Sequence, residues 1–186
     1  MLIGCKGIKT DKFYVPPFEL NPGEIIVLCL FGGEHFHETE MYLKDIFTGK
    51  TVNESVTVHK PLTFVEHFIE SALRSLLYPM RVGTYLKKYA NPESTFTTKI
   101  YGRCGITQKT KVNTLNWCSK RRLSLYATLS RTNNIVFDLI GLGFSDAEDI
   151  YATVKEKVNN GGAAILLDNF QDKKLDCTRY IELEWK

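Results

Sequence analysis

Two glycines and the polar residues after them form the stretch of this sequence best suited to chemistry. Gly32 and Gly33 follow the apolar run 25–30 and precede a segment with helical spacing. Backbone N–H groups at such a turn can bind an anion. The histidines of 34–38 could instead bind a metal, but a His-x-His pair at a helix start directs its rings about 200° apart, so we expect no metal site. The candidate nucleotide or anion site is Gly32, Gly33, Glu34, His35, Phe36 and His37.

The layout of this stretch is that of a phosphate-binding loop, in which a buried strand leads through glycines into a helix. Such a loop ends in Gly-Lys-Ser/Thr, so that an ammonium and a magnesium-binding hydroxyl meet the phosphates. Counting forward from Gly23, the Lys position is Phe36, the Ser/Thr position is His37 and the glycine before them is His35. The sequence therefore predicts the architecture of the loop without its phosphate-handling side chains.

The composition is that of a folded protein with a single domain. The chain has 186 residues, of which 44% are hydrophobic, enough to bury a two-sided sheet. A net charge of +3 is too small to indicate a nucleic-acid partner. Five widely spaced cysteines without a Cys-x-x-Cys pair favour reduced thiols in a cytoplasmic protein. No apolar run approaches the roughly 18 residues of a membrane span, so we expect the inner face of a membrane to be reached only through a partner.

Hydrophobic patterning predicts strands that alternate with helices. Continuous apolar strands, rather than alternating ones, favour a largely parallel sheet with helices on both faces. Residues 78–111 predict only a small peripheral element, with a short helix beginning near 82–86, or a mobile loop. The expected strands are short antiparallel ones in 1–20 and further ones at 25–30, 52–58, 135–137, 163–167 and, at a sheet edge, 179–185. The expected helices are 35–47, 62–77, 115–130 and one opened by a capping box at 145–148.

The order of these segments resembles the ATPase domain of ATP-binding-cassette (ABC) transporters, in the P-loop NTPase superfamily, over most of the chain. Residues 18–28 resemble the strand before the Walker A loop, and 115–129 resemble the signature helix. Residues 135–138 with 141–143 look like Walker B and the D-loop, and 161–184 are similar to the switch-histidine strand and the closing strand. The resemblance implies one domain over 1–186: an N-terminal β part and P-loop-like turn (1–60), a reduced helical subdomain (62–114) and the signature, Walker-B-like and closing segments (115–186).

The residues that handle phosphates in this family are replaced here. Asp138 stands at the Walker B aspartate, although a carboxylate at a strand end more often serves a turn or cap than a metal. Leu139 occupies the catalytic glutamate position, and Asn169 the switch-histidine position. The signature Ser-Gly-Gly is replaced by Asn116, Trp117 and Cys118, and no glutamine fits the Q-loop position. Phosphoryl transfer depends on positioning and charge stabilisation, so these losses together should remove most of the rate enhancement.

The resemblance therefore implies a catalytically degenerate ABC-type domain, a regulatory or interaction subunit of a transporter or another ATPase. ATP and Mg²⁺ are its candidate cofactors. One alternative is an active divergent ABC ATPase in which Lys44, Lys50 or a partner supplies the missing charge. Another is an unrelated α/β protein that binds a small molecule or a metal.

The implied partners are a second copy, an ABC ATPase or a membrane permease. We expect the signature helix to present a basic run on its exposed side as a docking patch. The candidate interface residues are Asn116, Trp117, Cys118, Lys120, Arg121, Arg122 and Gly143.

Overall fold

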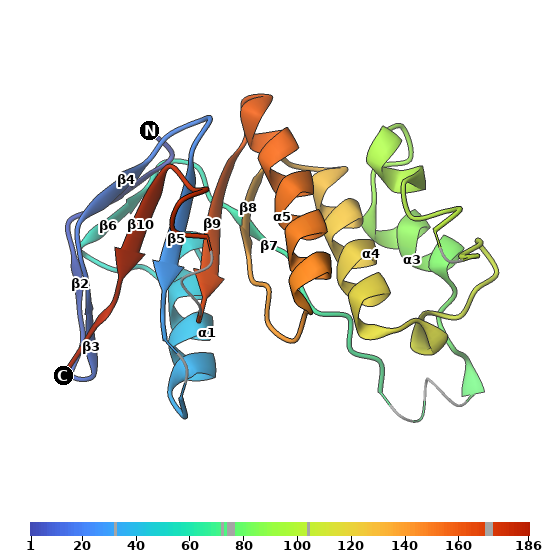
Figure 1. Ribbon diagram of the computed structural model, residues 1–186, viewed down its shortest axis with the longest axis horizontal. Helices are drawn as coiled ribbons and strands as arrows, with labels where there is room; N and C mark the ends of the chain where they lie inside the picture. The colour runs from blue at the N-terminus through green and yellow to red at the C-terminus, as the bar shows by residue number, and fades with distance from the viewer. Residues whose placement is uncertain (32, 72, 74–76, 104, 170–172) are drawn as a thin grey trace. The chain divides into compact units, whose positions relative to one another are not determined.

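The computed structural model describes residues 1–31, 33–71, 73, 77–103, 105–169 and 173–186. Their centre is a five-stranded parallel sheet, whose strands β10, β5, β9 and β8 run side by side in Figure 1. Every residue of β5, β8 and β9 is buried, and all but Asn134 and Asp168 are apolar, as expected of strands covered on both faces. The order across the sheet is β10 (Arg179–Glu182), β5 (Ile25–Cys29), β9 (Ala163–Asp168), β8 (Asn134–Phe137) and β7 (Thr63–Phe64).

Two small antiparallel sheets are built mainly from the first twenty residues, as predicted. One has the order β4-β1-β6 and the other β11-β3-β2. Their apolar side chains share one core with the parallel sheet and with helix α1 (Phe36–Phe47), whose Leu43, Ile46 and Phe47 are fully buried. The strands are β1 (Ile3–Cys5), β2 (Ile8–Lys9), β3 (Phe13–Val15), β4 (Phe18–Leu20), β6 (Val56–Val58) and β11 (Glu184–Trp185).

The predicted edge strand over 179–185 is divided between two sheets. β10 lies at the edge of the parallel sheet, where it pairs with β5. β11 instead pairs antiparallel with β3. Ile181 and Leu183 are buried, so the predicted alternation holds although one strand has become two.

The prediction of a helix over 62–77 is wrong for its first half. Thr63 and Phe64 form β7, which pairs in parallel with β8. Residues 65–71 have no regular structure, and 72 and 74–76 lie outside the described residues. A short apolar segment rich in β-branched residues suits both a strand and a helix, and here the available sheet edge decides.

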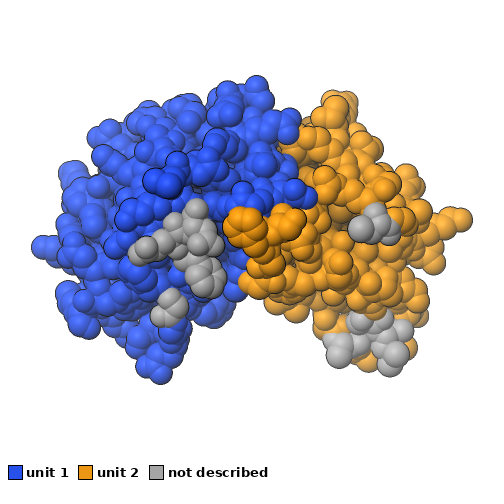
Figure 2. Space-filling view, viewed as in Figure 1, with its two compact units in different colours: residues 1–64, 133–140, 147–186 blue, residues 65–132, 141–146 orange. Residues whose placement is uncertain are grey.

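The described chain forms two compact units, coloured separately in Figure 2. Unit 1 contains Met1–Phe64, Asn133–Ile140 and Ala147–Lys186, and therefore the whole parallel sheet. Unit 2 contains Val65–Thr132 and Gly141–Asp146.

Helix α5 (Phe144–Asn159) begins before Ser145, so this serine lies inside the first turn and not at the predicted capping position.

Unit 2 is a small helical unit with its own core. The Tyr85 hydroxyl lies 3.2 Å from the Ser124 Oγ, and the rings of Phe96 and Tyr126 meet edge to face. Within the described ranges, no helix is both long enough and apolar enough to cross a bilayer. The elements of the unit are α3 (Val82–Tyr89), the 3-10 turns η1 (Thr95–Thr98) and η2 (Val112–Thr114), and α4 (Trp117–Leu129).

Candidate functional site

The turn between β5 and α1 has an unusual backbone. Phe31 has a φ of 54°, a left-handed value that is uncommon for a residue with a side chain, and Gly33 has a φ of 132°, which favours glycine. The Leu30 N–H donates to the Asp168 carbonyl at 2.7 Å, which ties the start of the turn to the end of β9. Gly32 lies outside the described residues. The strand, glycine turn and helix predicted from the sequence are therefore present.

The first turn of α1 places Phe36 and His37 where a phosphate-binding loop has Lys and Ser/Thr. Phe36 packs partly buried against the core, whereas the His37 side chain is 81% exposed. The Nδ1 of His37 lies 3.5 Å from the Oε2 of Glu40, a carboxylate buried in the same helix. His35 precedes the helix without a side-chain capping bond.

Carboxylates dominate the charge at this helix start. The His35 imidazole lies between Glu34 at 3.3 Å and Glu38 at 3.8 Å. Carboxylates near a helix N-terminus are stabilised by its partial positive charge, and they would compete there with an anionic ligand. The protein's own carboxylates thus complement the partial positive charge of this helix end.

Lys12 and Trp185, two residues that sequence reasoning missed, also reach this turn. The Lys12 ammonium donates to Glu38 at 2.8 Å, a bond that lowers the pKa of that carboxyl. The Trp185 ring stacks on His35 with centroids 6.3 Å apart, and its Nε1 donates to the Leu30 carbonyl at 3.1 Å. Lys12 lies in the turn between β2 and β3, and Trp185 lies on β11. Both are distant in sequence from the glycine turn, so only tertiary structure brings them here.

The carboxyl ends of β8 and β9 contribute two buried aspartates to the same edge of the sheet. Asp138 follows β8, and its Oδ1 accepts from the Ile140 N–H at 3.0 Å, the turn role that the sequence favours. Asp168 ends β9, and its Oδ1 accepts from the Asn169 N–H at 2.8 Å. Sequence reasoning did not select Asp168, although a carboxylate that directly ends an apolar run is a usable signal.

The positions beside these aspartates carry no general base. Leu139 is 8% exposed, so an apolar side chain stands where hydrolysis would need a carboxylate near water. The Oδ1 of Asn169 is buried, and among the described residues it has no hydrogen-bond partner. An amide can donate to a phosphate, but it cannot become a cation as an imidazole can.

Lys44 and Lys50 do not supply the missing cation at the glycine turn. Lys44 lies about two helical turns after Phe36, is 9% exposed, and places its ammonium 4.8 Å from the centre of the Phe64 ring. Lys50 follows the opposite end of α1, where its ammonium lies 3.8 Å from Asp45.

In unit 2, Asn116 and Trp117 occupy the start of α4. The Asn116 Oδ1 accepts from the Ser119 N–H at 2.8 Å, so this residue caps the helix. Trp117 is 45% exposed, and its ring centroid lies 5.6 Å from that of the His67 ring. A Cβ added to Gly141 would lie 3.0 Å from the Trp117 Nε1, so the indole packs on the D-loop-like segment.

The predicted exposed basic run is wrong. Arg121 is 4% exposed, Lys120 is half-buried, and Arg122 pairs with Asp146 at 3.0 Å. These residues lie on α4, and long basic side chains can bury their apolar stems along a packed surface.

Two further interface candidates differ in exposure. Cys118 is buried, and its thiol donates a hydrogen bond to the Asp146 carboxylate. This bond and the nearby Arg122 guanidinium lower the pKa of Asp146. Gly143 is exposed, with open space where a side chain would be.

Solved structures show what this fold is similar to. No protein-family model matches the chain, and no curated protein matches it. A structure assigned as an ABC transporter ATP-binding protein from Pyrococcus furiosus covers 97% of this chain and 96% of its own, with a TM-score of 0.73 at 13% identity. An ATP-binding subunit of an ABC transporter covers 99% and 86%, with a TM-score of 0.70 at 11% identity.

CbiO1 from Clostridium perfringens, part of the ABC transporter complex CbiONQ, covers 98% of this chain and 84% of its own, with a TM-score of 0.66 at 13% identity. At these identities the likeness establishes the fold. The chain has the fold of an ABC transporter ATP-binding domain, as the order of its segments predicts.

Proposed function

We propose that this protein is an ABC-type domain that does not hydrolyse ATP and that acts as a regulatory or interaction subunit of a transporter or another ATPase. The observation that carries the proposal is the first turn of α1, where Phe36 and His37 replace the ammonium and the hydroxyl of a phosphate-binding loop. Lys12, a cation that reaches this turn, is paired with Glu38.

These residues do not fit a triphosphate with its magnesium ion. Glu34 and Glu38 place negative charge beside the helix end that would receive the phosphates. Like charges a few ångströms apart repel, and solvent weakens this repulsion between exposed groups without removing it. We therefore derive no hydrolytic step for this site.

An active but divergent ATPase is the second candidate. It would use Asp138 and Asp168, the two buried carboxylates at the carboxyl edge of the sheet, with a cation donated by a partner. The positions of Lys44 and Lys50 weigh against this candidate, because neither lies at the glycine turn.

Calorimetric titration with ATP and Mg²⁺, together with a phosphate-release assay, tests the proposal. We expect no binding in the micromolar range and no phosphate release above the blank, with an active ABC ATPase domain as the assay control. The matched variant is Asp138→Asn, which keeps an oxygen for the Ile140 N–H. Micromolar binding with turnover that this variant abolishes would establish the second candidate instead.

Exposed aromatic side chains in unit 2 support a pairing role. Trp117 is 45% exposed at the signature position, and Phe144, just after the D-loop-like segment, is 74% exposed. Aromatic anchors are enriched at the centres of protein interfaces. We propose that they bind a second ABC-type domain, either another copy or a catalytic one. Analytical ultracentrifugation should show association that weakens in Trp117→Ser and Phe144→Ser, whereas Tyr89→Ser, on α3, should leave it unchanged.

A second apolar group precedes α3 and suits a membrane permease. Ile69, Leu73, Leu77 and Tyr78 are between 58% and 87% exposed, well above the exposure usual for such side chains. We propose that they receive a cytoplasmic helix of the permease. Co-purification of a permease from native membranes should be lost in Leu73→Ser and kept in the surface control Val52→Ser. Equal recovery with both variants would contradict this assignment.

A further inference from the structure

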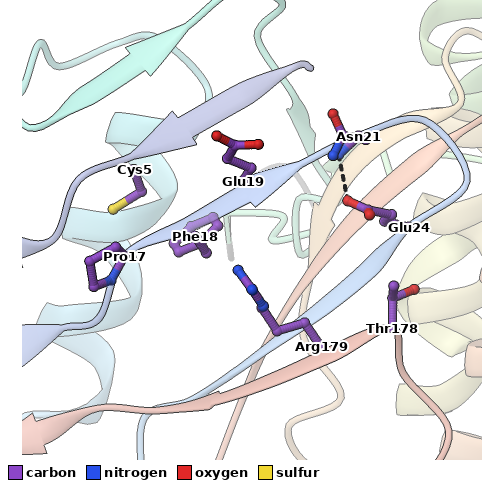
Figure 3. A pocket seen from close by; sticks show the side chains of 8 residues that line it. All are labelled: Cys5, Pro17, Phe18, Glu19, Asn21, Glu24, Thr178 and Arg179. Atoms are coloured by element: carbon purple, nitrogen blue, oxygen red, sulfur yellow. Dashed lines mark hydrogen bonds between the residues drawn. The ribbon is translucent and has the colours of Figure 1, made fainter.

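A cavity of 540 Å³ opens at the amino ends of β5 and β10, the edge of the sheet opposite the glycine turn. Its volume lies within the range of pockets that hold small molecules, roughly 300 to 1,000 Å³. Glu19 on β4 and Arg179 on β10 line it from two different sheets. Figure 3 shows the Arg179 side chain extending from β10 towards β4.

The cavity presents opposite charges that do not neutralise each other. Glu19 and Arg179 both line it, yet within the described part of the chain neither has an ion pair or a side-chain hydrogen bond. Glu24 adds a second carboxylate, so the lining carries one cation and two anions. A ligand that complements it needs an anionic group, a cationic group and preferably an excess of positive charge.

The polar wall of the cavity is fixed by hydrogen bonds. The Asn21 N–H donates to the Glu24 Oε2 at 2.7 Å, drawn as a dashed line in Figure 3. The Ile25 N–H donates to the Thr178 Oγ1 at 3.0 Å, and the Thr178 N–H donates back to the Ile25 carbonyl at 2.9 Å. Thr178 therefore keeps its hydroxyl proton for a ligand, and the wall needs little ordering when one binds.

We propose that this cavity binds a small amphoteric molecule of the basic amino-acid class, with one carboxylate and at least one further cationic group beyond its α-ammonium. The ligand carboxylate pairs with the Arg179 guanidinium, whose fork of N–H donors matches a carboxylate in geometry. The ligand's cationic groups pair with Glu19 and with the Glu24 oxygen that the Asn21 N–H leaves open. The site is independent of the proposed function, because it lies at the other edge of the sheet.

Three probes of similar length separate the charges that the cavity recognises. L-lysine carries both kinds of charge, cadaverine lacks the carboxylate, and L-norleucine lacks the side-chain ammonium. Calorimetric titration should show L-lysine binding at least about tenfold more tightly than either analogue, since each removes a charge-assisted contact. Equal affinities for the three, or no binding of L-lysine at millimolar concentrations, would overturn the proposal.

Charge-neutralising variants connect binding to the cavity. Arg179→Gln should lower the affinity for L-lysine to that of cadaverine while leaving cadaverine binding unchanged. Glu19→Gln should lower it to that of L-norleucine. Both side chains are exposed, so neither change should unfold the protein. Glu54→Gln, an exposed carboxylate outside the cavity, is the matched control, and binding that responds no more to the two cavity variants than to this control refutes the site.

Discussion

Trp185 is the residue whose replacement most directly tests how the glycine turn is held. Its indole N–H donates to the Leu30 carbonyl, and its ring contacts Phe13 at 5.6 Å and stacks on His35. Trp185→Phe removes the hydrogen bond but keeps an aromatic ring, which costs about 1 kcal/mol. Trp185→Ala also removes the packing of a half-buried ring, so we expect a total of about 2 to 3 kcal/mol.

The measurement is thermal and denaturant unfolding, followed by circular dichroism. For a chain of this size, 1 kcal/mol corresponds to a change in Tm of roughly 2 to 4 °C. The loss in the free energy of unfolding should therefore be two to three times as large in Trp185→Ala as in Trp185→Phe. Hydrogen exchange of the amides around Phe31 should speed up in the alanine variant, because the turn loses its cover.

Trp117→Phe is the control, since Trp117 is 45% exposed and its described ring contact is with His67 in unit 2. We expect it to change the free energy of unfolding by less than about 1 kcal/mol. If Trp185→Phe and Trp185→Ala are both as stable as the parent, or if exchange at the turn is unchanged, the reasoning that the C-terminal strand anchors this turn is refuted.

Three further predictions concern the framework of the two units. Gly162→Ala should lower the free energy of unfolding by about 1 to 3 kcal/mol, because a Cβ there would meet backbone carbonyl oxygens at 2.4 and 2.9 Å. Gly143→Ala, which has open space around the added Cβ, should change it little. Equal losses of stability in denaturant unfolding would contradict this packing. Asn116→Ala should cost about 1 kcal/mol of stability and Asn116→Ser much less, since serine also caps a helix, and indistinguishable variants would argue against the cap. The Cys118 thiol and the Arg122 guanidinium lower the pKa of Asp146, so Asp146→Asn should lower stability at neutral pH by at most about 1 kcal/mol. The difference between the two proteins should shrink as the pH falls through the lowered pKa of Asp146. A difference that does not change with pH would refute the pairing.

Local patterns in the sequence were sufficient for the elements whose burial is continuous. The run from Ile25 to Leu30, bounded by glycines, favours a strand covered on both faces, and the glycines after it predict the turn into α1. The absence of Lys and Ser/Thr at Phe36 and His37 is likewise a property of the sequence alone, because the count from Gly23 needs no coordinates.

Tertiary structure decided whatever depends on partners distant in the chain. Residues 63–64 became a strand because the edge of β8 was available, and Arg121, expected to be exposed, is buried in the folded chain. Trp185 lies on the turn because β11 pairs with β3, a contact that no periodicity encodes. Local sequence determines the backbone preferences of a segment, whereas long-range pairing determines which side chains contact it. Both candidate sites are formed by contacts between residues that are distant in the sequence.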